Sequence, residues 1–312
     1  MSKANKRLEW RHVNKWIYRM LAVLSSVTAV GAAQAKDLSI YISADMEGIA
    51  GVVSEQQLGP GGFEYERFRE FMTGEVNAAI EGATEAGATR FVVSDSHGNA
   101  QSLLIDKLPP AVRVVRSFPR PLEMMQGIEE GHFDGAILLG YHTATTNLQG
   151  VRAHTISSAK LTAVRLNGTA ASEAALSSAI AGQFGVPVIL VTGDSEVVKE
   201  TQALLGNVEG AVVKWPYSFH SAQTLTPQAA RELIRERAAA AVRRIADFKP
   251  RKLGGPVTLE LSFKNYRPVE MLGYLPIVER VDSHTIRYRA PDILQISKFL
   301  VFALEYQSDL AP

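Results

Sequence analysis

The 312-residue sequence contains no cysteine. The chain therefore forms no disulfide, and its stability depends on a buried core and on any metal that it binds. The same absence removes thiolates from the possible metal ligands, which leaves histidine and carboxylate side chains. With 46% hydrophobic and 21% charged residues, the composition is that of an ordinary globular protein large enough to bury a core.

Clustered positive charge is also missing outside the first 35 residues. That segment has one acid, Glu9, and six bases, Lys3, Lys6, Arg7, Arg11, Lys15 and Arg19. The whole chain has a formal net charge of +1 and this segment +5, which leaves −4 for the rest. A mildly acidic body without a basic cluster argues against nucleic acid as the main partner, because phosphate binding requires clustered Lys and Arg.

Long hydrophobic runs are rare, and the clearest one covers 14 residues from Met20 to Ala33. It follows the basic stretch and leads into Ala33-Gln34-Ala35, which matches an A-x-A cleavage site. We predict that residues 1–35 are a signal peptide, that the protein is exported to the periplasm, and that the mature chain has no stable membrane association. An uncleaved membrane anchor is the alternative, although a spanning helix needs ~20 residues.

Hydrophobic periodicity predicts an α/β fold. Apolar residues alternate with polar ones from Leu38 to about Ser43, which is typical of a strand. From Tyr65, apolar residues recur at steps of three or four, which predicts an amphipathic helix that ends near Gly87. We expect further strands at 90–93, 135–139 and 188–192 and a helix at 172–184. This alternation predicts a three-layer core with a mostly parallel sheet, the α/β metal-binding core, over residues 36–200.

The pattern is less regular after Asp194. Thr226-Pro227 is typical of a helix start, with threonine as the cap and proline at the first helical position. We expect that helix to reach about residue 245, followed by a strand at 257–263 and a closing helix at 292–306. Residues 201–312 are assigned to a C-terminal α+β portion packed on the core, and the alternative is one continuous domain.

Polar clusters follow four of the predicted core strands. They are Asp45-Met46-Glu47-Gly48, Ser94-Asp95-Ser96-His97-Gly98, Gly140-Tyr141-His142 and Thr192-Gly193-Asp194. In open α/β sheets, ligands bind beyond the carboxyl ends of the strands, so clusters that are distant in sequence are expected to converge there.

Asp45, Glu47, His97 and His142 are candidate metal ligands. Asp45 and Glu47 are two residues apart, so their side chains point the same way, and adjacent carboxylates repel unless a cation or proton lies between them. Histidine and carboxylate donors without sulfur suit zinc, and manganese or cobalt less specifically. Taken singly, each residue also fits a structural role, as a loop cap or a hydrogen-bonded histidine. Asp95 either orients the His97 ring or caps the turn.

The ordered motifs resemble a known family. These motifs are Ser43-Ala44-Asp45-Met46-Glu47-Gly48, Ser94-Asp95-Ser96-His97, Leu139-Gly140-Tyr141-His142 and an Asn-Gly-x-x-x-Ser-Glu run that ends at Glu173. In order and spacing they are similar to the motifs of the binuclear zinc D-aminopeptidases associated with bacterial dipeptide-transport operons. The similarity runs from about Leu38 to Asp194 and continues more loosely to Tyr306.

The resemblance implies a metal-dependent aminopeptidase that hydrolyses N-terminal residues, D-amino acids such as D-Ala in particular, from short peptides. It implies two Zn²⁺ per subunit, with Asp45 bridging them, Glu47 and His142 completing one site, and His97 and Glu173 the other. Without the resemblance, Glu173 would only be an acid at a helix N-terminus, where the helix dipole favours it. The resemblance also implies a ring-forming homo-oligomer, in the family a decamer of stacked pentamers.

His154, four residues after Gly150, matches the family's catalytic histidine. Family descriptions call this residue the nucleophile. We expect a metal-activated water to attack instead, since zinc lowers the pKa of its water to ~7, while His154 transfers the proton or stabilises the oxyanion. We expect Gly150 to allow a tight approach of its loop. The alternative for His154 is a histidine of a surface loop.

Two other functions remain open from the sequence. An exported peptide-binding protein with one structural metal would use the same cleft without cleaving the peptide, but such proteins usually pair two similar α/β lobes and only one is evident. A metal-dependent amidase or esterase would keep the metal site and cleave another bond. Export sets the chain apart from the familiar members of the family, which look cytoplasmic, and peptides with D-alanine from cell-wall turnover are the substrates that we expect.

Overall fold

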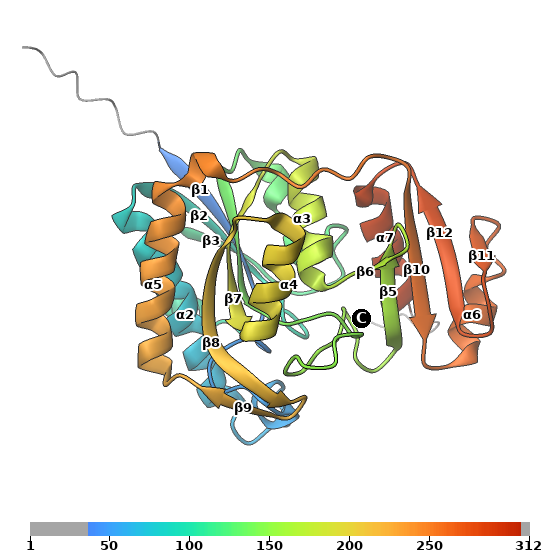
Figure 1. Ribbon diagram of the computed structural model, residues 1–312, viewed down its shortest axis with the longest axis horizontal. Helices are drawn as coiled ribbons and strands as arrows, with labels where there is room; N and C mark the ends of the chain where they lie inside the picture. Colours follow the sequence, from blue (N-terminus) through green and yellow to red (C-terminus); the bar gives the residue numbers. More distant parts are fainter. Residues whose placement is uncertain (1–36, 307–312) are drawn as a thin grey trace, which may run out of the picture. The chain divides into compact units, whose positions relative to one another are not determined.

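The computed structural model describes residues 37–306 (Figure 1). The predicted signal peptide and its cleavage site lie outside these residues. The described residues form one compact unit. Within the described part, no helix is both long enough and apolar enough to cross a membrane.

A seven-stranded sheet in the order β3-β2-β1-β4-β7-β8-β9 forms the centre of the fold. Its strands are β1 (Leu38–Ala44), β2 (Ala88–Asp95), β3 (Val112–Val115), β4 (Gly135–Tyr141), β7 (Val188–Asp194), β8 (Glu209–Ser218) and β9 (Ser221–Thr224). All neighbours pair in parallel except β8 and β9. Every residue of β4 and β7 is buried, as expected for central parallel strands with helices on both faces.

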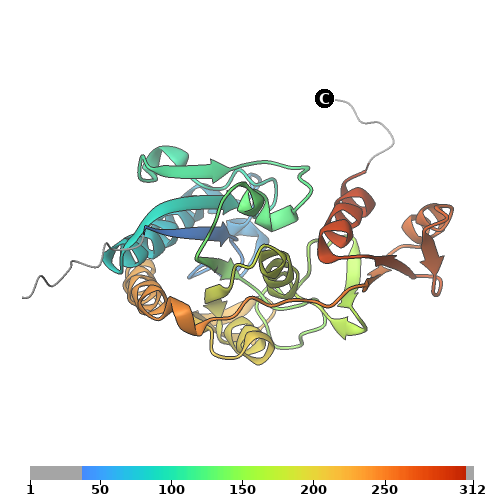
Figure 2. The ribbon, with the colours of Figure 1, turned by 90° about the horizontal axis from the view of Figure 1, so that it is seen from above.

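Helices cover the two faces of this sheet (Figures 1 and 2). On one face lie α2 (Tyr65–Glu85) and α5 (Pro227–Arg243), which pack against each other. On the other lie α3 (Glu173–Gln183) and α4 (Ser195–Leu205). The predicted apolar stripe of α2 is buried. Thr226 caps α5 and proline occupies its first turn, as expected from the sequence.

A second, antiparallel sheet has the order β11-β12-β10-β5-β6. Its strands are β5 (Leu161–Leu166), β6 (Thr169–Ala170), β10 (Val257–Phe263), β11 (Val278–Arg280) and β12 (Thr285–Ala290). Along β10, fully buried residues alternate with half-buried ones, so one face of the sheet is apolar. This face packs on α7 (Ile293–Glu305), which also contacts α3, while α6 (Tyr266–Leu272) lies near the outer strands.

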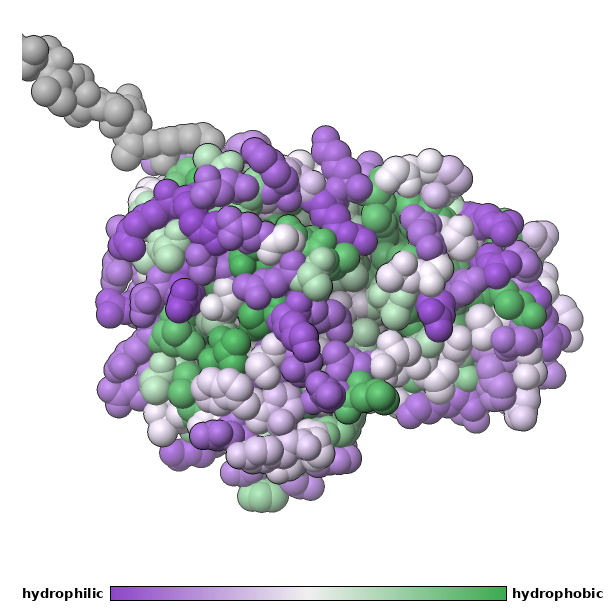
Figure 3. Space-filling model, viewed as in Figure 1, coloured by the Kyte–Doolittle hydropathy of each residue, from purple (hydrophilic) through white to green (hydrophobic). Residues whose placement is uncertain are grey.

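The predicted fold class is confirmed: a mixed α/β fold with a largely parallel sheet and a second, α+β region. Strands β8 and β9 join the parallel sheet although they follow residue 200, and β5 and β6 join the antiparallel sheet although they precede it. The two sheets therefore do not divide the chain at a single residue. On the face seen in Figure 3, hydrophobic residues lie in small groups between hydrophilic ones.

Candidate metal centre

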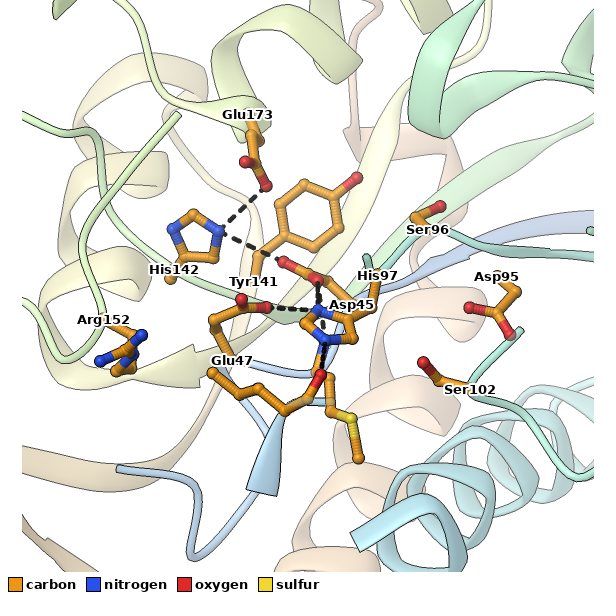
Figure 4. A network of polar contacts seen from close by, with 12 residues as sticks. Asp45, Glu47, Asp95, Ser96, His97, Ser102, Tyr141, His142, Arg152 and Glu173 are labelled. Carbon is orange, nitrogen blue, oxygen red and sulfur yellow. Dashed lines mark hydrogen bonds and ion pairs between the residues drawn. The ribbon is translucent and has the colours of Figure 1, made fainter. Parts of the chain in front are cut away.

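Three neighbouring parallel strands end at one edge of the large sheet and bring the predicted donors together. Asp45 and Glu47 follow β1, His97 follows β2 and His142 follows β4, and β1 lies between the other two strands. Glu173, the first residue of α3, completes the group. Figure 4 shows the five side chains pointing toward one another. All five predicted ligands are buried and adjacent.

The turn after β1 packs directly on the end of β4. The backbone N–H of Asp45 donates to the Leu139 carbonyl at 2.8 Å, and that of Gly48 donates to the Gly140 carbonyl at 2.6 Å. A Cβ atom on Gly48 would lie 2.2 Å from the Tyr141 carbonyl oxygen. Only glycine therefore allows this approach, which places the carboxylates beside the donor that follows β4.

Asp45 contacts both histidines through its two carboxylate oxygens. His97 Nδ1 lies 3.3 Å from Asp45 Oδ1 and 2.8 Å from Glu47 Oε2. His142 Nε2 lies 3.4 Å from Asp45 Oδ2 and 3.1 Å from Glu173 Oε2. Asp45 is therefore at the centre of the group, where a bridging ligand would be.

Backbone carbonyls orient the histidine rings. His97 Nε2 lies 2.7 Å from the Leu58 carbonyl, and His142 Nδ1 lies 3.1 Å from that of Thr143. His154 follows the same pattern, with its Nδ1 2.9 Å from a carbonyl two residues earlier. A ring nitrogen that donates to a carbonyl leaves the other nitrogen free to bind a metal or a proton. In each ring, that other nitrogen faces the carboxylates.

The electrostatics of the group favour a positive charge at its centre. Burial raises the pKa of Asp45 well above its usual value, and the charge of Glu47 raises it further. Burial by itself would lower the pKa of His142, but Glu173 and Asp45 outweigh this effect and raise it to about 10. For His97 as well, burial opposes a rise in pKa that Glu47 and Asp45 impose. Carboxylates this crowded need a proton or a metal ion between them.

Two buried atoms at the centre have no hydrogen-bond partner among the described residues, namely Asp45 Oδ2 and His142 Nε2. The donors form two groups of three, and within each group the donor atoms lie within 4.8 Å of one another. The first group is Asp45, Glu47 and His97, and the second is His142, His154 and Glu173. Nitrogen and oxygen donors in two adjacent groups, two of them without a hydrogen bond, fit zinc.

The contacts between the outer donors differ from the pairing that the resemblance implies. His97 lies beside Glu47, and His142 lies beside Glu173. The resemblance instead joins Glu47 with His142 and His97 with Glu173. Both arrangements have Asp45 in the middle, and the pairing of the outer donors stays a prediction.

His154 lies beside the donor group. Its ring stacks on that of His142, with centroids 4.0 Å apart and planes 11° apart, and its Nε2 lies 3.8 Å from Glu173 Oε1. Burial lowers the pKa of His154, and the neighbouring His142 lowers it further, so the neutral ring is favoured. A Cβ atom on Gly150 would lie 1.9 Å from Thr143 Oγ1, which agrees with the tight approach expected there.

A cleft of about 560 Å³ opens onto the donor group. Asp45, Glu47, His97, His154 and Glu173 line it, together with residues 117–118, 123–124 and 156–159. The volume is within the range of small-molecule and peptide pockets. A short peptide can therefore reach both the donors and His154.

Two acids of the strand-end clusters have structural roles. Asp95 Oδ2 accepts a hydrogen bond from the Leu103 N–H at 2.7 Å, so Asp95 holds a turn and does not orient the His97 ring. Asp194 caps α4 and accepts from the Val151 N–H at 2.8 Å. Asp194 thereby ties the loop of His154 to the end of β7.

A buried lysine that the sequence analysis did not single out holds the turn after β1. Lys214, in β8, is fully buried. Its ammonium group donates to the carbonyls of Glu47, of Ile49 at 3.2 Å and of Val52 at 2.7 Å. The one available sign in the sequence was a lysine inside an apolar stretch, between Val213 and Trp215.

Lys214→Met is expected to lower the free energy of unfolding by about 3 kcal/mol or more, because each buried carbonyl left without a donor costs about 1–3 kcal/mol. Chemical denaturation at neutral pH would measure the change. Lys199→Met, at an exposed lysine of α4, is the control and should shift the value by no more than about 0.5 kcal/mol. Equal unfolding midpoints for the Lys214 variant and the original protein would show that the turn does not depend on this lysine.

Comparisons with known proteins lead to one group of enzymes. Residues 38–302 match the Peptidase_M55 family, described as D-aminopeptidase. A D-aminopeptidase of Bacillus subtilis (strain 168) is 32% identical over 272 residues, which are 86% of this chain and 97% of that protein. The solved structure of the Zn-dependent D-aminopeptidase DppA from Bacillus subtilis, a self-compartmentalizing protease, has a TM-score of 0.81 at 30% identity and the same coverage, 86% of this chain and 97% of that one.

Proposed function

The chain belongs to the Peptidase_M55 family of D-aminopeptidases and is a metal-dependent aminopeptidase. From this premise we propose that the donor group binds two zinc ions and that the enzyme removes N-terminal D-residues from short peptides. The main support for this proposal is that five buried side chains with nitrogen or oxygen donors, from distant parts of the sequence, lie together at the end of a cleft. The similarity to a zinc-dependent structure supports zinc as the metal.

Asp45, with one oxygen toward each histidine, is proposed to bridge the two ions, and Glu47, His97, His142 and Glu173 are proposed to complete their coordination. Asp45 Oδ2 and His142 Nε2 support this assignment, because both are buried without a hydrogen bond among the described residues, which is rare unless a ligand satisfies such atoms.

When bound, the zinc ions supply Lewis-acid chemistry that polarises the peptide carbonyl and makes water a better nucleophile. We propose that His154 acts as the general base and acid beside them. Its Nδ1 is held by a backbone carbonyl, so Nε2 faces the cleft and, in the neutral ring, accepts a proton from the attacking water. The same nitrogen then returns the proton to the leaving amine.

We further propose that the enzyme is exported to the periplasm and assembles as a homo-oligomer. The basic, apolar and A-x-A stretches within residues 1–35 support export. The self-compartmentalizing DppA supports assembly, and the expected form is the decamer of the family. In this location, short peptides with N-terminal D-Ala are the expected substrates. Light scattering on the purified mature protein would give the number of subunits.

The test of the proposed function joins metal analysis to a substrate panel. Purified mature protein is expected to contain about two zinc ions per chain and to hydrolyse D-Ala-D-Ala while leaving L-Ala-L-Ala intact. At most one tight ion and no hydrolysis would favour a peptide-binding protein. Cleavage of amides or esters that lack a free amino group would favour an amidase or esterase.

Removal of the metal by a chelator is expected to lower the activity by roughly a hundredfold or more, and added Zn²⁺, Mn²⁺ or Co²⁺ is expected to restore it to differing degrees. The metal-free protein is also expected to unfold at a lower temperature, because buried carboxylates lose the cation between them. Activity and melting temperature would be measured before and after dialysis. Full activity in a preparation without metal would refute the proposed role of zinc.

A further inference from the structure

The cleft contains a buried carboxyl group that the proposed chemistry does not use. Glu123 is the first residue of a short 3₁₀ helix, η3 (Glu123–Met125), and lines the same cleft as Asp45 and Glu173. Only 8% of it is exposed. Its side chain forms no hydrogen bond or ion pair with any other residue between 37 and 306. A mostly buried carboxyl that lines the cleft without a protein partner among these residues is open to a ligand that enters the cleft.

The backbone around Glu123 is held tightly to the donor edge of the sheet. The Met124 carbonyl accepts hydrogen bonds from Ser43 Oγ at 3.0 Å and Ser96 Oγ at 3.1 Å, and each serine lies within two residues of a proposed metal ligand. Glu123 itself has a φ of 52°, in the left-handed region that glutamate seldom adopts. The backbone at Glu123 is therefore fixed beside the donor edge of the sheet, and its side chain lines the cleft that the donors also line.

Arg120, near this segment, forms no ion pair with Glu123. Arg120 Nη2 donates to the Asp95 carbonyl at 2.8 Å, and its guanidinium carbon lies 4.1 Å from the centre of the Phe118 ring. Burial raises the pKa of Glu123 to about 8, the charge of Glu305 adds to the rise, and Arg120 offsets it only in part. The carboxyl thus forms no ion pair with a positive side chain among the described residues, and the nearby Arg120 stabilises its ionised form only in part.

The charges that line the cleft are not balanced by metal alone. Two zinc ions would carry four positive charges, whereas five carboxyl groups line the cleft, those of Asp45, Glu47, Glu123, Glu173 and Glu305. Among the described residues that line the cleft, none is a lysine or an arginine. The side of the cleft from buried Glu123 to exposed Glu305 at the end of α7 therefore holds two carboxyl groups, and no basic side chain is among the described residues that line it.

We propose that Glu123, with Glu305 near it, forms a subsite for an alkylammonium group of the substrate. This inference rests on the proposed function and adds to it the class of group that the substrate presents. The group is either the α-ammonium of the N-terminal residue or the side-chain ammonium of a basic D-residue, and both are bound by the same ion pair. The peptide's terminal carboxylate lies away from this side because like charges repel.

The test uses the zinc-loaded mature enzyme and the p-nitroanilides of D-alanine, D-norleucine and D-lysine. Glu123→Gln keeps the shape of the side chain and removes its charge. Its kcat/KM is expected to fall roughly tenfold or more, mainly through KM, because a charged hydrogen bond is lost, while the zinc content stays unchanged. A similar fall for all three substrates identifies the α-ammonium, and a fall for D-lysine alone identifies the side chain. Either result supports the subsite.

Two further variants make the test decisive. Glu123→Gly also removes the carboxylate, and glycine adopts the left-handed backbone freely, so it should fold and show the same losses. Glu130→Gln, at an exposed glutamate of η4 (Ile128–Glu130) outside the cleft, should keep the original kinetics. Unchanged kcat/KM in both Glu123 variants for all three substrates would overturn the subsite. An original enzyme without activity on any of them would instead refute the proposed function.

Discussion

Asp45→Asn is expected to remove most of the bound zinc and to lower kcat/KM by roughly a thousandfold or more. The two oxygens of Asp45 face His97 and His142 at 3.3 and 3.4 Å, so this carboxylate contacts both halves of the donor group. Asparagine keeps the shape but offers one oxygen and no charge, and neither ion would then have a bridging ligand. Zinc content by elemental analysis and hydrolysis of D-Ala-D-Ala would measure the two effects together.

Asp95→Asn is the matched control for this prediction. Asp95 is equally buried and lies two residues before His97, but its carboxylate holds the Leu103 N–H and does not face the donors. Asparagine keeps an oxygen that accepts the same hydrogen bond, so zinc content and activity should be close to the original. Full zinc and full activity in the Asp45 variant would mean that the ligand assignment is wrong.

His154→Ala is expected to lower kcat by about 10²–10⁴-fold while the zinc content and KM change little. Its Nε2 faces the cleft 3.8 Å from Glu173 Oε1, and burial together with His142 favours the neutral ring that a general base needs. Alanine removes the group that carries the proton and leaves the five proposed ligands in place. Steady-state kinetics with D-Ala-D-Ala and zinc analysis on the same preparation would separate the two roles.

The zinc content decides how a loss of activity in this variant is interpreted. His154 lies in one donor group with His142 and Glu173, so a loss of zinc along with activity would identify it as a ligand. His132→Ala, at a histidine whose side chain is 78% exposed, should leave both quantities unchanged. Original kcat in the His154 variant would exclude the proposed proton transfer.

Much of the donor edge followed from local sequence. The first strand and the strands before His97 and His142 are short apolar runs followed by polar residues, and strand alternation with helices predicts that they lie parallel. Parallel neighbours end at the same edge, so the meeting of Asp45, His97 and His142 was predictable from the sequence. Glu173 was different, because an acid at a helix start is common, and only the resemblance to a family made it a ligand.

The sequence by itself predicted the fold class and singled out Asp45, Glu47, His97 and His142 as candidate donors, because these depend on periodicity and short motifs, while the export signal stays a proposal. Only the tertiary structure decided what surrounds them. The ammonium of Lys214 meets a carbonyl 167 residues away, and Ser43 meets the carbonyl beside Glu123 across 81 residues. No local pattern encodes such contacts, since they depend on which strands pair and how closely a turn packs. Whether a buried lysine or glutamate has a partner is therefore known only once the chain is folded.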